Sequence, residues 1–408
     1  MNNRSSSSTV LTNLHQENEN LVLEPLLPSN QDIEQSTNGL LESEEQRDFQ
    51  SVCFTYISRL RNLRSLMTAR PSRQCCYDSL KWIPVIFILA LVTWSYYAYV
   101  VQMCILTIDS VPKKVIYLCI YHPLLILFLW SYYRTMFQPT VGPPKEFYIS
   151  DIEGQQIKSA QTIDERRAIL VRISRQANLS LLTRHFDGSI RYCFVCQCIK
   201  PDRAHHCSIC EKCVLRYDHH CPWTNSCVSY GNYKFFVLFL CWAWIFCIYV
   251  AATSLEYFIQ FWKIVSNIEK NGDNTVPSSG KFHLFFVFFV SIMFGISISS
   301  LFFYHLYLTG KNRTTIESFR APIFESGPQK EGFNLGWKRN FQEIFGTKFL
   351  KAIIPISTTR GDGVHYQVNS ILLGGLQQQT TNPIRSNDND NNIISPFIRS
   401  DADILPFE

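Results

Sequence analysis

The segment that decides the organisation of this 408-residue chain is residues 192–227, YCFVCQCIKPDRAHHCSICEKCVLRYDHHCPWTNSC. It holds eight of the fifteen cysteines and four of the ten histidines. Cysteine mixed with histidine at short spacing indicates metal binding rather than a disulfide framework. Metal-binding thiols must stay reduced, so we expect this segment to face the cytosol.

Two tetrahedral zinc sites fit the composition of this segment. Zinc takes four cysteine or histidine ligands, and a Cys-x2-Cys pair is a common half-site. Cys193 with Cys196 forms one such pair, and Cys207 with Cys210 forms the other. Two Cys3His sites can then be closed by His206, Cys213, His220 and Cys227. The candidates left over are Cys198, His205, His219 and Cys221.

Three neighbouring residues of the segment indicate covalent chemistry. Asp218, His219 and Cys221 fall within four positions of one another. A cysteine attacks as its thiolate, an adjacent imidazole can accept the proton, and an aspartate can hold that imidazole in the required tautomer. Spacing alone does not decide which of His219 and His220 binds metal and which acts as the base. A structural zinc finger or a RING-type ubiquitin ligase would leave Cys221 without a role.

Four long uncharged stretches flank the segment, two before it and two after it. They cover residues 82–108, 115–133, 235–255 and 282–310. A bilayer core needs about 20 apolar residues in a helix, so each stretch predicts a membrane-spanning helix. We therefore expect an all-α integral membrane protein with four transmembrane helices and the cysteine-rich module between helices 2 and 3. A channel is disfavoured, because the stretches contain no Asp, Glu, Lys or Arg.

Basic residues set the expected orientation of these helices. Residues 51–81 hold six Lys or Arg, residues 134–234 hold fourteen and residues 311–351 hold eight. The two other loops, residues 109–114 and 256–281, hold two and three. Lys and Arg accumulate in cytosolic loops, so both termini and the module are expected in the cytosol. The need to keep the metal-binding thiols reduced independently places the module on the cytosolic side of the membrane.

The rest of the chain divides by composition. Residues 1–50 predict a disordered acidic tail, and residues 366–408 a mostly disordered C-terminal tail. Cys75 and Cys76 are candidates for acylation in the basic juxtamembrane segment 51–81. The other expected units are the helix pair 82–133, a linker 134–190, the module 191–234, the helix pair 235–310 and a cytosolic region 311–365. The net charge of +5 is too small to indicate a nucleic acid partner.

The motif Asp218-His219-His220-Cys221 within this cysteine array resembles the DHHC family of protein S-acyltransferases, the palmitoyltransferases. Residues 314–317, Thr-Thr-Ile-Glu, match the family's TTxE motif, and Asn340 matches the asparagine of its PaCCT motif. The resemblance covers residues 75–365. It implies transfer of a palmitoyl group from palmitoyl-CoA to cysteines of membrane-associated proteins at the Golgi, plasma membrane or endosomes.

The resemblance also implies roles for individual residues. One structural zinc is expected on Cys193, Cys196, His206 and Cys213. The second is expected on Cys207, Cys210, His220 and Cys227. Cys221 becomes the nucleophile, His219 its base and Asp218 the residue that orients the base, with Thr315 close to Asp218.

A further group of residues is implied to bind the acyl-CoA. An acyl-chain cavity is expected around Trp223, Phe236 and Phe239, with its closed end near Ser95. The phosphates of coenzyme A are expected at Lys200, Arg203 and His205. Lipid-facing packing is the alternative for the aromatic residues, and a solvated surface is the alternative for the basic ones. An interfacial amphipathic helix is expected near residues 337–345.

Overall fold

The computed structural model of the chain describes residues 79–271 and 279–369, and all of them except Ser79 lie in the compact unit Leu80–Glu408. The predictions for the acidic tail, for Cys75 and Cys76 and for most of the C-terminal tail lie outside the described residues. The described helices are α3 (Ile83–Tyr96), its π-helical continuation η1 (Tyr97–Ile105), α4 (Val111–Phe137), the short 3-10 turn η2 (Lys145–Phe147), α5 (Asp151–Ser159), α6 (Ile163–Gln176), α7 (Tyr233–Asn271), α8 (Ser279–Lys311), α9 (Thr315–Phe319), α10 (Trp337–Phe345) and α11 (Phe349–Ala352). The described strands are β1 (Thr183–Arg184), β2 (Tyr192–Cys193), β3 (Cys198–Ile199), β4 (His205–Cys207), β5 (Lys212–Val214), β6 (His219–Cys221), β7 (Ser226–Val228), β8 (Ile323–Phe324) and β9 (Gly327–Pro328).

Four helical segments of the described chain are long and apolar enough to cross a membrane, which confirms the predicted number. They are Ile83–Ile105, Val111–Phe137, Tyr233–Asn267 and Gly280–Lys311. Both α4 and α7 extend beyond the predicted stretches, because a charged residue ends an uncharged stretch without ending a helix. Lys113 in the first turn of α4 pairs at 2.6 Å with Glu256, the first charge after the apolar part of α7.

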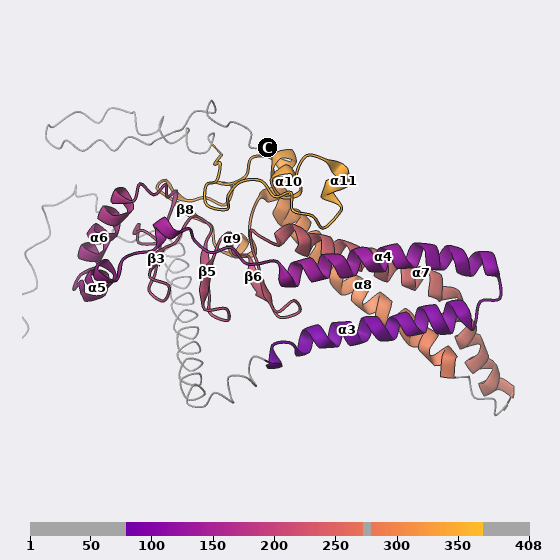
Figure 1. The fold of residues 1–408 in the computed structure, drawn as a ribbon. Coiled ribbons are helices and arrows are strands. Elements are labelled where there is room, and N and C mark those ends of the chain that lie inside the picture. Colours follow the sequence, from indigo (N-terminus) through magenta and orange to yellow (C-terminus); the bar gives the residue numbers. More distant parts are fainter. Residues whose placement is uncertain (1–78, 272–278, 370–408) are drawn as a thin grey trace, which may run out of the picture. The chain divides into compact units, whose positions relative to one another are not determined.

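Helix α7 lies at the centre of the helical part. In its most apolar window 56% of the residues are buried, against 17–28% for the three other segments. It packs along α8 on one side and α4 on the other, while η1 packs on α8 (Figure 1). Stacked rings of Tyr99 and Tyr121, 4.4 Å apart, fill the space between η1 and α4. The apolar side chains left exposed on the outer helices suit a lipid environment.

The cysteine-rich module consists of three short antiparallel hairpins, β2–β3, β4–β5 and β6–β7. In each hairpin one turn residue has positive φ, namely Gln197, Glu211 and Asn225. The expectation of an all-α chain did not include these hairpins. Strands of two or three residues carry too little periodicity to be read from a sequence.

Residues 134–190, expected as a linker, fold against the module. Helices α5 and α6 are capped at their N-termini by Ser150 and Thr162, whose hydroxyls accept hydrogen bonds from the backbone N–H three residues later. Buried apolar side chains of this segment form one small core with the module: Phe147, Ile149, Ile157, Leu170, Ile173, Ile190, Ile199, Ala204 and Leu215. The segment is therefore a structural part of the module.

The region after α8 folds back onto that helix. Helix α10 has the bounds expected for the amphipathic helix, and it buries Ile344 and Asn340. The Asn340 amide donates to the carbonyl of Gly310 at 2.7 Å, which ties α10 to the end of α8. Trp337, at the start of α10, remains 71% exposed.

Candidate active site

A fourteen-residue repeat organises the three hairpins. Their first cysteines occupy the same place in each hairpin: Cys193, Cys207 and Cys221. The first two hairpins have a second cysteine three residues later, whereas the third has Thr224. The repeat is visible in the sequence alone. It shows that Cys221 occupies the position of the first cysteine of a Cys-x2-Cys pair but has no second cysteine three residues later.

Each set of four predicted metal ligands comes together in the structure, with all donor atoms of a set within 4.8 Å of one another. In the first set, Nδ1 of His206 lies 3.6 Å from Cys193 Sγ and 3.2 Å from Cys196 Sγ. In the second set, Nδ1 of His220 lies 3.7, 3.4 and 3.7 Å from the sulfurs of Cys207, Cys210 and Cys227. A tetrahedral zinc separates such ligand atoms by about 3.5–3.8 Å. Both sets fit a tetrahedral metal.

The two ligand sets join successive hairpins. The first hairpin supplies a Cys-x2-Cys pair, and the second completes it with His206 and Cys213. The second hairpin's own pair is completed by His220 and Cys227 of the third. A metal in the second set therefore fixes the hairpin that carries Cys221.

Asp218 and His219 form a tightly held pair. Nδ1 of His219 lies 2.6 Å from Oδ2 of Asp218, which is 1% exposed. The Thr315 backbone N–H donates to Oδ1 of Asp218 at 2.9 Å, and the Thr315 hydroxyl donates to Oδ2 at 2.7 Å. The expected closeness of Thr315 to Asp218 is confirmed. These bonds keep the carboxylate fixed behind the histidine.

The electrostatics of the site favour a thiolate on Cys221 and a proton on His219. Burial opposes charge on His219, but hydrogen bonds to Asp218 and Cys221 raise the pKa of His219 to about 9. Burial also opposes a thiolate, yet the hydrogen bond with His219 lowers the pKa of Cys221 below its ordinary value. A lowered thiol pKa beside an imidazole is the pattern of a reactive cysteine.

Helix α4 holds the third hairpin at the membrane helices. The Tyr132 hydroxyl donates to the Trp223 carbonyl at 2.7 Å. The carbonyl of Thr135 accepts from Ser226 Oγ at 3.2 Å and from Asn232 Nδ2 at 2.9 Å. Sequence reasoning did not single out Tyr132 or Thr135, because both lie in an apolar helix far from the cysteines along the chain.

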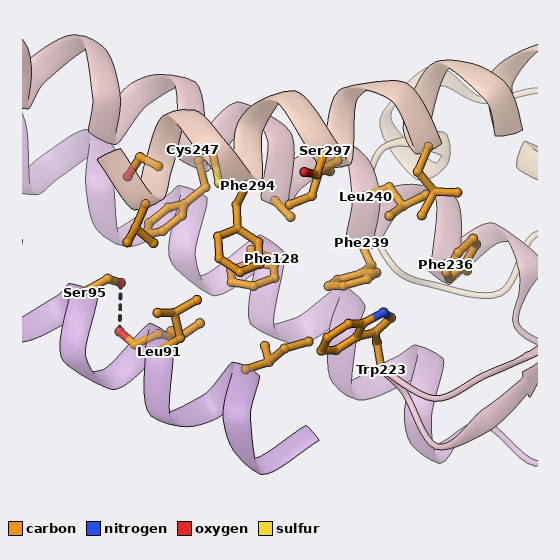
Figure 2. Close-up of a pocket in the computed structure, with 18 of the residues that line it drawn as sticks. Leu91, Ser95, Phe128, Trp223, Phe236, Phe239, Leu240, Cys247, Phe294 and Ser297 are labelled. Atoms are coloured by element: carbon orange, nitrogen blue, oxygen red, sulfur yellow. Dashed lines mark hydrogen bonds between the residues drawn. The ribbon is translucent and has the colours of Figure 1, made fainter. Parts of the chain in front are cut away.

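One apolar cavity of about 370 Å³ connects Cys221 with the interior of the helices. Its lining includes the predicted residues Ser95, Trp223, Phe236 and Phe239. Figure 2 shows Trp223 and Phe236 at one end of the cavity and Ser95 at the other. The Ser95 hydroxyl also donates to the Val92 carbonyl of its own helix at 2.9 Å. The shape suits an extended alkyl chain whose head lies near Cys221.

The prediction that Arg203 contacts coenzyme A is wrong. Its side chain is 0% exposed and makes two hydrogen bonds to the Glu317 carboxylate, at 2.8 and 2.7 Å. Its guanidinium also donates to Asn312 and lies over the rings of Phe333 and Tyr366, which meet each other edge-on. Arg203 joins the module to the region after α8, and its positive charge is compensated inside the protein.

The two other predicted phosphate contacts are less buried. Lys200 and His205 are both partly exposed. Burial and the nearby Arg191 guanidinium hold the pKa of His205 well below its usual range, so this imidazole is uncharged at neutral pH. Lys200 is the member of the predicted trio that can offer a charge to solvent.

Arg203→Met should destabilise the protein by about 3–5 kcal/mol, because it leaves the Glu317 charge buried without its partner. Arg184→Met is the matched control, since Arg184 pairs with Glu325, which is 79% exposed. An exposed pair contributes about 0–1 kcal/mol. Denaturant unfolding of the purified variants measures both effects. Equal losses in the two variants would contradict the role given to Arg203.

Comparison with known proteins identifies the family. Residues 187–322 match the family model described as DHHC palmitoyltransferase. The chain is 47% identical over 312 residues to palmitoyltransferase ZDHHC20-A of Danio rerio, covering 75% of this chain and 84% of that protein. It is 45% identical over 312 residues to palmitoyltransferase ZDHHC20 of Homo sapiens, covering 76% and 82%. It is 41% identical over 323 residues to palmitoyltransferase ZDHHC2 of Homo sapiens, covering 79% and 84%.

The matched region contains both metal-ligand sets and the residues around Cys221. The resemblance read from the motifs is thereby confirmed, and so is the expectation of an acyltransferase. The chain belongs to the DHHC palmitoyltransferase family, as a multi-pass membrane enzyme that attaches palmitoyl groups to proteins.

Proposed function

We propose that Cys221 is the nucleophile that carries the acyl group and that a long-chain acyl-CoA, mainly palmitoyl-CoA, is the donor. One observation carries the proposal: Cys221 belongs to neither metal-ligand set, has its pKa lowered by His219 and lines the apolar cavity. Each buried CH2 contributes about 0.8 kcal/mol. An acyl chain lying in the cavity would therefore hold its thioester beside the Cys221 sulfur.

The reaction divides into two transfers. The other ring nitrogen of His219 takes the Cys221 proton, while the His219 Nδ1–H stays hydrogen-bonded to Asp218. The Asp218 carboxylate balances the charge of the imidazolium. The sulfur attacks the thioester carbonyl carbon, the bond to the coenzyme A sulfur breaks, and coenzyme A leaves as a thiol with the proton from His219. In the second transfer His219 takes the proton of an acceptor cysteine, whose sulfur attacks the acyl carbon of the new thioester. The bond between that carbon and the Cys221 sulfur breaks, and His219 returns the proton to Cys221.

We assign zinc to both ligand sets. Three thiolates and one imidazole in a tetrahedral arrangement are typical of structural zinc, which keeps no open position for a substrate. When bound, the two ions would supply folding energy rather than Lewis acid chemistry. Cys193, Cys196, His206 and Cys213 would hold one ion, and the set completed by His220 and Cys227 would hold the other.

The acceptors proposed are cysteines of membrane-associated proteins, because Cys221 lies where the module meets the membrane helices. We place the module and both termini in the cytosol, on the basic residues and the reduced thiols of the sequence. Lys200 and His205 remain the proposed contacts for the coenzyme A phosphates. Golgi, plasma membrane and endosomes remain the proposed compartments.

The proposal is tested with the purified full-length chain and labelled palmitoyl-CoA. We expect one label per chain on Cys221, released by neutral hydroxylamine because it is a thioester, and then transfer of the label to a cysteine peptide. A label that maps to another residue, or that resists hydroxylamine, would overturn the assignment of Cys221.

Ser95→Phe should shift the preferred donor toward shorter acyl chains. The larger ring would fill the end of the cavity opposite Trp223, and each CH2 excluded would lose about 0.8 kcal/mol. Reaction with short acyl-CoAs should be spared. Rates of Cys221 acylation across a series of chain lengths measure the shift, and an unchanged profile in the folded variant would remove Ser95 from the acyl site. Thr93→Phe is a matched control, because Thr93 lies on the same helix, is exposed and is absent from the cavity lining.

A further inference from the structure

The orientation of the His219 ring requires more than its hydrogen bond to Asp218. The last torsion of a histidine side chain is broad and roughly two-fold, so packing must select one ring orientation. His219 has to keep Nδ1 on Asp218 and leave its other nitrogen for Cys221. Its side chain is 31% exposed, so burial alone does not fix it. The groups that contact the His219 ring therefore determine whether its free nitrogen is directed at Cys221.

Two rings from the membrane helices lie against His219. Phe236 of α7 meets it edge-on, with 5.4 Å between ring centroids and 73° between planes. His305 of α8 lies 5.9 Å away at 38°. Phe236 and His305 also meet edge-on, at 5.0 Å and 83°. The three rings pack on one another, so loss of one opens space into which His219 can turn.

His305 is itself held in place. It is 1% exposed, and the Tyr233 hydroxyl lies 3.2 Å from its Nδ1. The donor atoms of His305, His219 and Asp218 all lie within 4.8 Å of one another. A metal on these three is disfavoured, because the Asp218 oxygens already accept hydrogen bonds from His219 and Thr315. A titratable side chain inside a membrane helix is a functional candidate, and here its neighbours are the proposed base and its partner.

We infer that His305 is a positioning residue for the transfer reaction, acting through His219. Its ring, fixed by Tyr233, forms with Phe236 the wall that keeps His219 directed at Cys221. The inference rests on the proposed roles of Cys221 and His219. It predicts that both transfers slow by the same factor when the wall is removed, because His219 moves a proton in each.

The test compares His305→Ala and His305→Phe with the full-length wild-type chain. Single-turnover acylation of Cys221 is measured over a range of palmitoyl-CoA concentrations, followed by transfer to a cysteine peptide and metal analysis. His305→Ala should lower the rate constants of both transfers by about ten- to a hundredfold, the cost of a misplaced catalytic group. The palmitoyl-CoA concentration at half-maximal rate and the metal content should stay as in the wild type. His305→Phe, which restores the ring, should recover most of the rate.

His283→Ala is the matched control on the same helix. His283 contacts Trp94 and Tyr97, away from Asp218 and His219, so its loss should leave both rate constants unchanged. Wild-type rates in His305→Ala would overturn the inference. A raised half-maximal concentration with an unchanged maximal rate would do so too, and so would a His305→Phe protein no faster than His305→Ala.

A second variant keeps the test decisive if His305→Ala loses metal or fails to fold. Tyr233→Phe removes only the hydroxyl that holds the His305 ring. It should slow both transfers by a common factor of about two to five, which corresponds to one modest hydrogen bond, and it should retain both metals. Unchanged rates in this variant would count against the inference. A wild-type chain that forms no adduct on Cys221 would instead refute the proposed function.

Discussion

Cys221→Ser should abolish acylation of the protein by palmitoyl-CoA while leaving both metals bound. Cys221 lies outside the two ligand sets, so its replacement removes no metal ligand. The thiol-to-hydroxyl change is small, but an alcohol has no accessible anion at neutral pH, whereas the pKa of Cys221 is already lowered by His219. We expect a loss of more than about a thousandfold, because the nucleophile of covalent catalysis is gone. Single-turnover labelling together with metal analysis measures both parts of the expectation.

Cys198→Ser provides the control for this substitution. Cys198 is a buried cysteine of the same module and belongs to neither ligand set. Its replacement tests whether any thiol-to-hydroxyl change in the module stops the reaction. We expect acylation of Cys221 to continue in this variant. Equal loss in the two variants, or a label retained in Cys221→Ser, would show that the reactive thiol is not Cys221.

The eight candidate metal ligands were predictable because their spacing is local, whereas their division into two sets was implied by the resemblance. Each set takes its ligands from two neighbouring hairpins, and the Cys-x2-Cys pairs mark where each set begins. The membrane helices were predictable for a related reason, since an uncharged stretch of sufficient length is itself the signal. The resemblance was still needed to separate His219 from His220. The fourteen-residue repeat would have separated them as well, because it places His206 and His220 at equivalent positions.

The position of Arg203 could not be read from local sequence. An arginine among metal ligands is expected at the surface, where it could meet a phosphate. Its actual partner Glu317 lies 114 residues further along the chain. Glu317 also completes the capping box of α9 with Thr314, which orients the carboxylate toward Arg203. The motif Thr-Thr-Ile-Glu therefore does two things: its second threonine holds Asp218, and its glutamate neutralises Arg203.

The hydrogen bonds that seat the catalytic hairpin were likewise hidden from the sequence. Tyr132 is one of many aromatic residues in an apolar stretch. The neighbouring sequence does not distinguish it from a side chain that faces lipid. The fold brings its hydroxyl to the Trp223 carbonyl, 91 residues away along the chain. A buried hydroxyl needs a partner, so this contact fixes the hairpin relative to the cavity.

His219→Ala and His220→Ala should fail in different ways, although the two residues are adjacent. His219 is hydrogen-bonded to Asp218 and is not a member of either metal-ligand set. His219→Ala should therefore retain two metals per chain. Its acylation should slow by about 10²- to 10⁴-fold, the contribution typical of a general base. His220 completes the second ligand set, so His220→Ala should lose that metal. Loss of the metal frees the third hairpin from the second, and structural zinc supplies folding energy, so stability should fall together with activity.

The measurements are the metal content, stability and acylation rate of the two purified variants. The wild type should contain two zinc ions, His219→Ala two and His220→Ala one. Both variants should unfold at a lower denaturant concentration than the wild type, because His219→Ala takes a partner from the buried Asp218 carboxylate and His220→Ala takes a ligand from the metal. Metal content and acylation rate therefore separate the two variants. Addition of zinc should not restore acylation to His219→Ala, because its defect lies in proton transfer. Equal metal loss in both variants would contradict the assignment of His220 as a metal ligand and His219 as the base. A fully active His219→Ala protein would show that His219 is not the base.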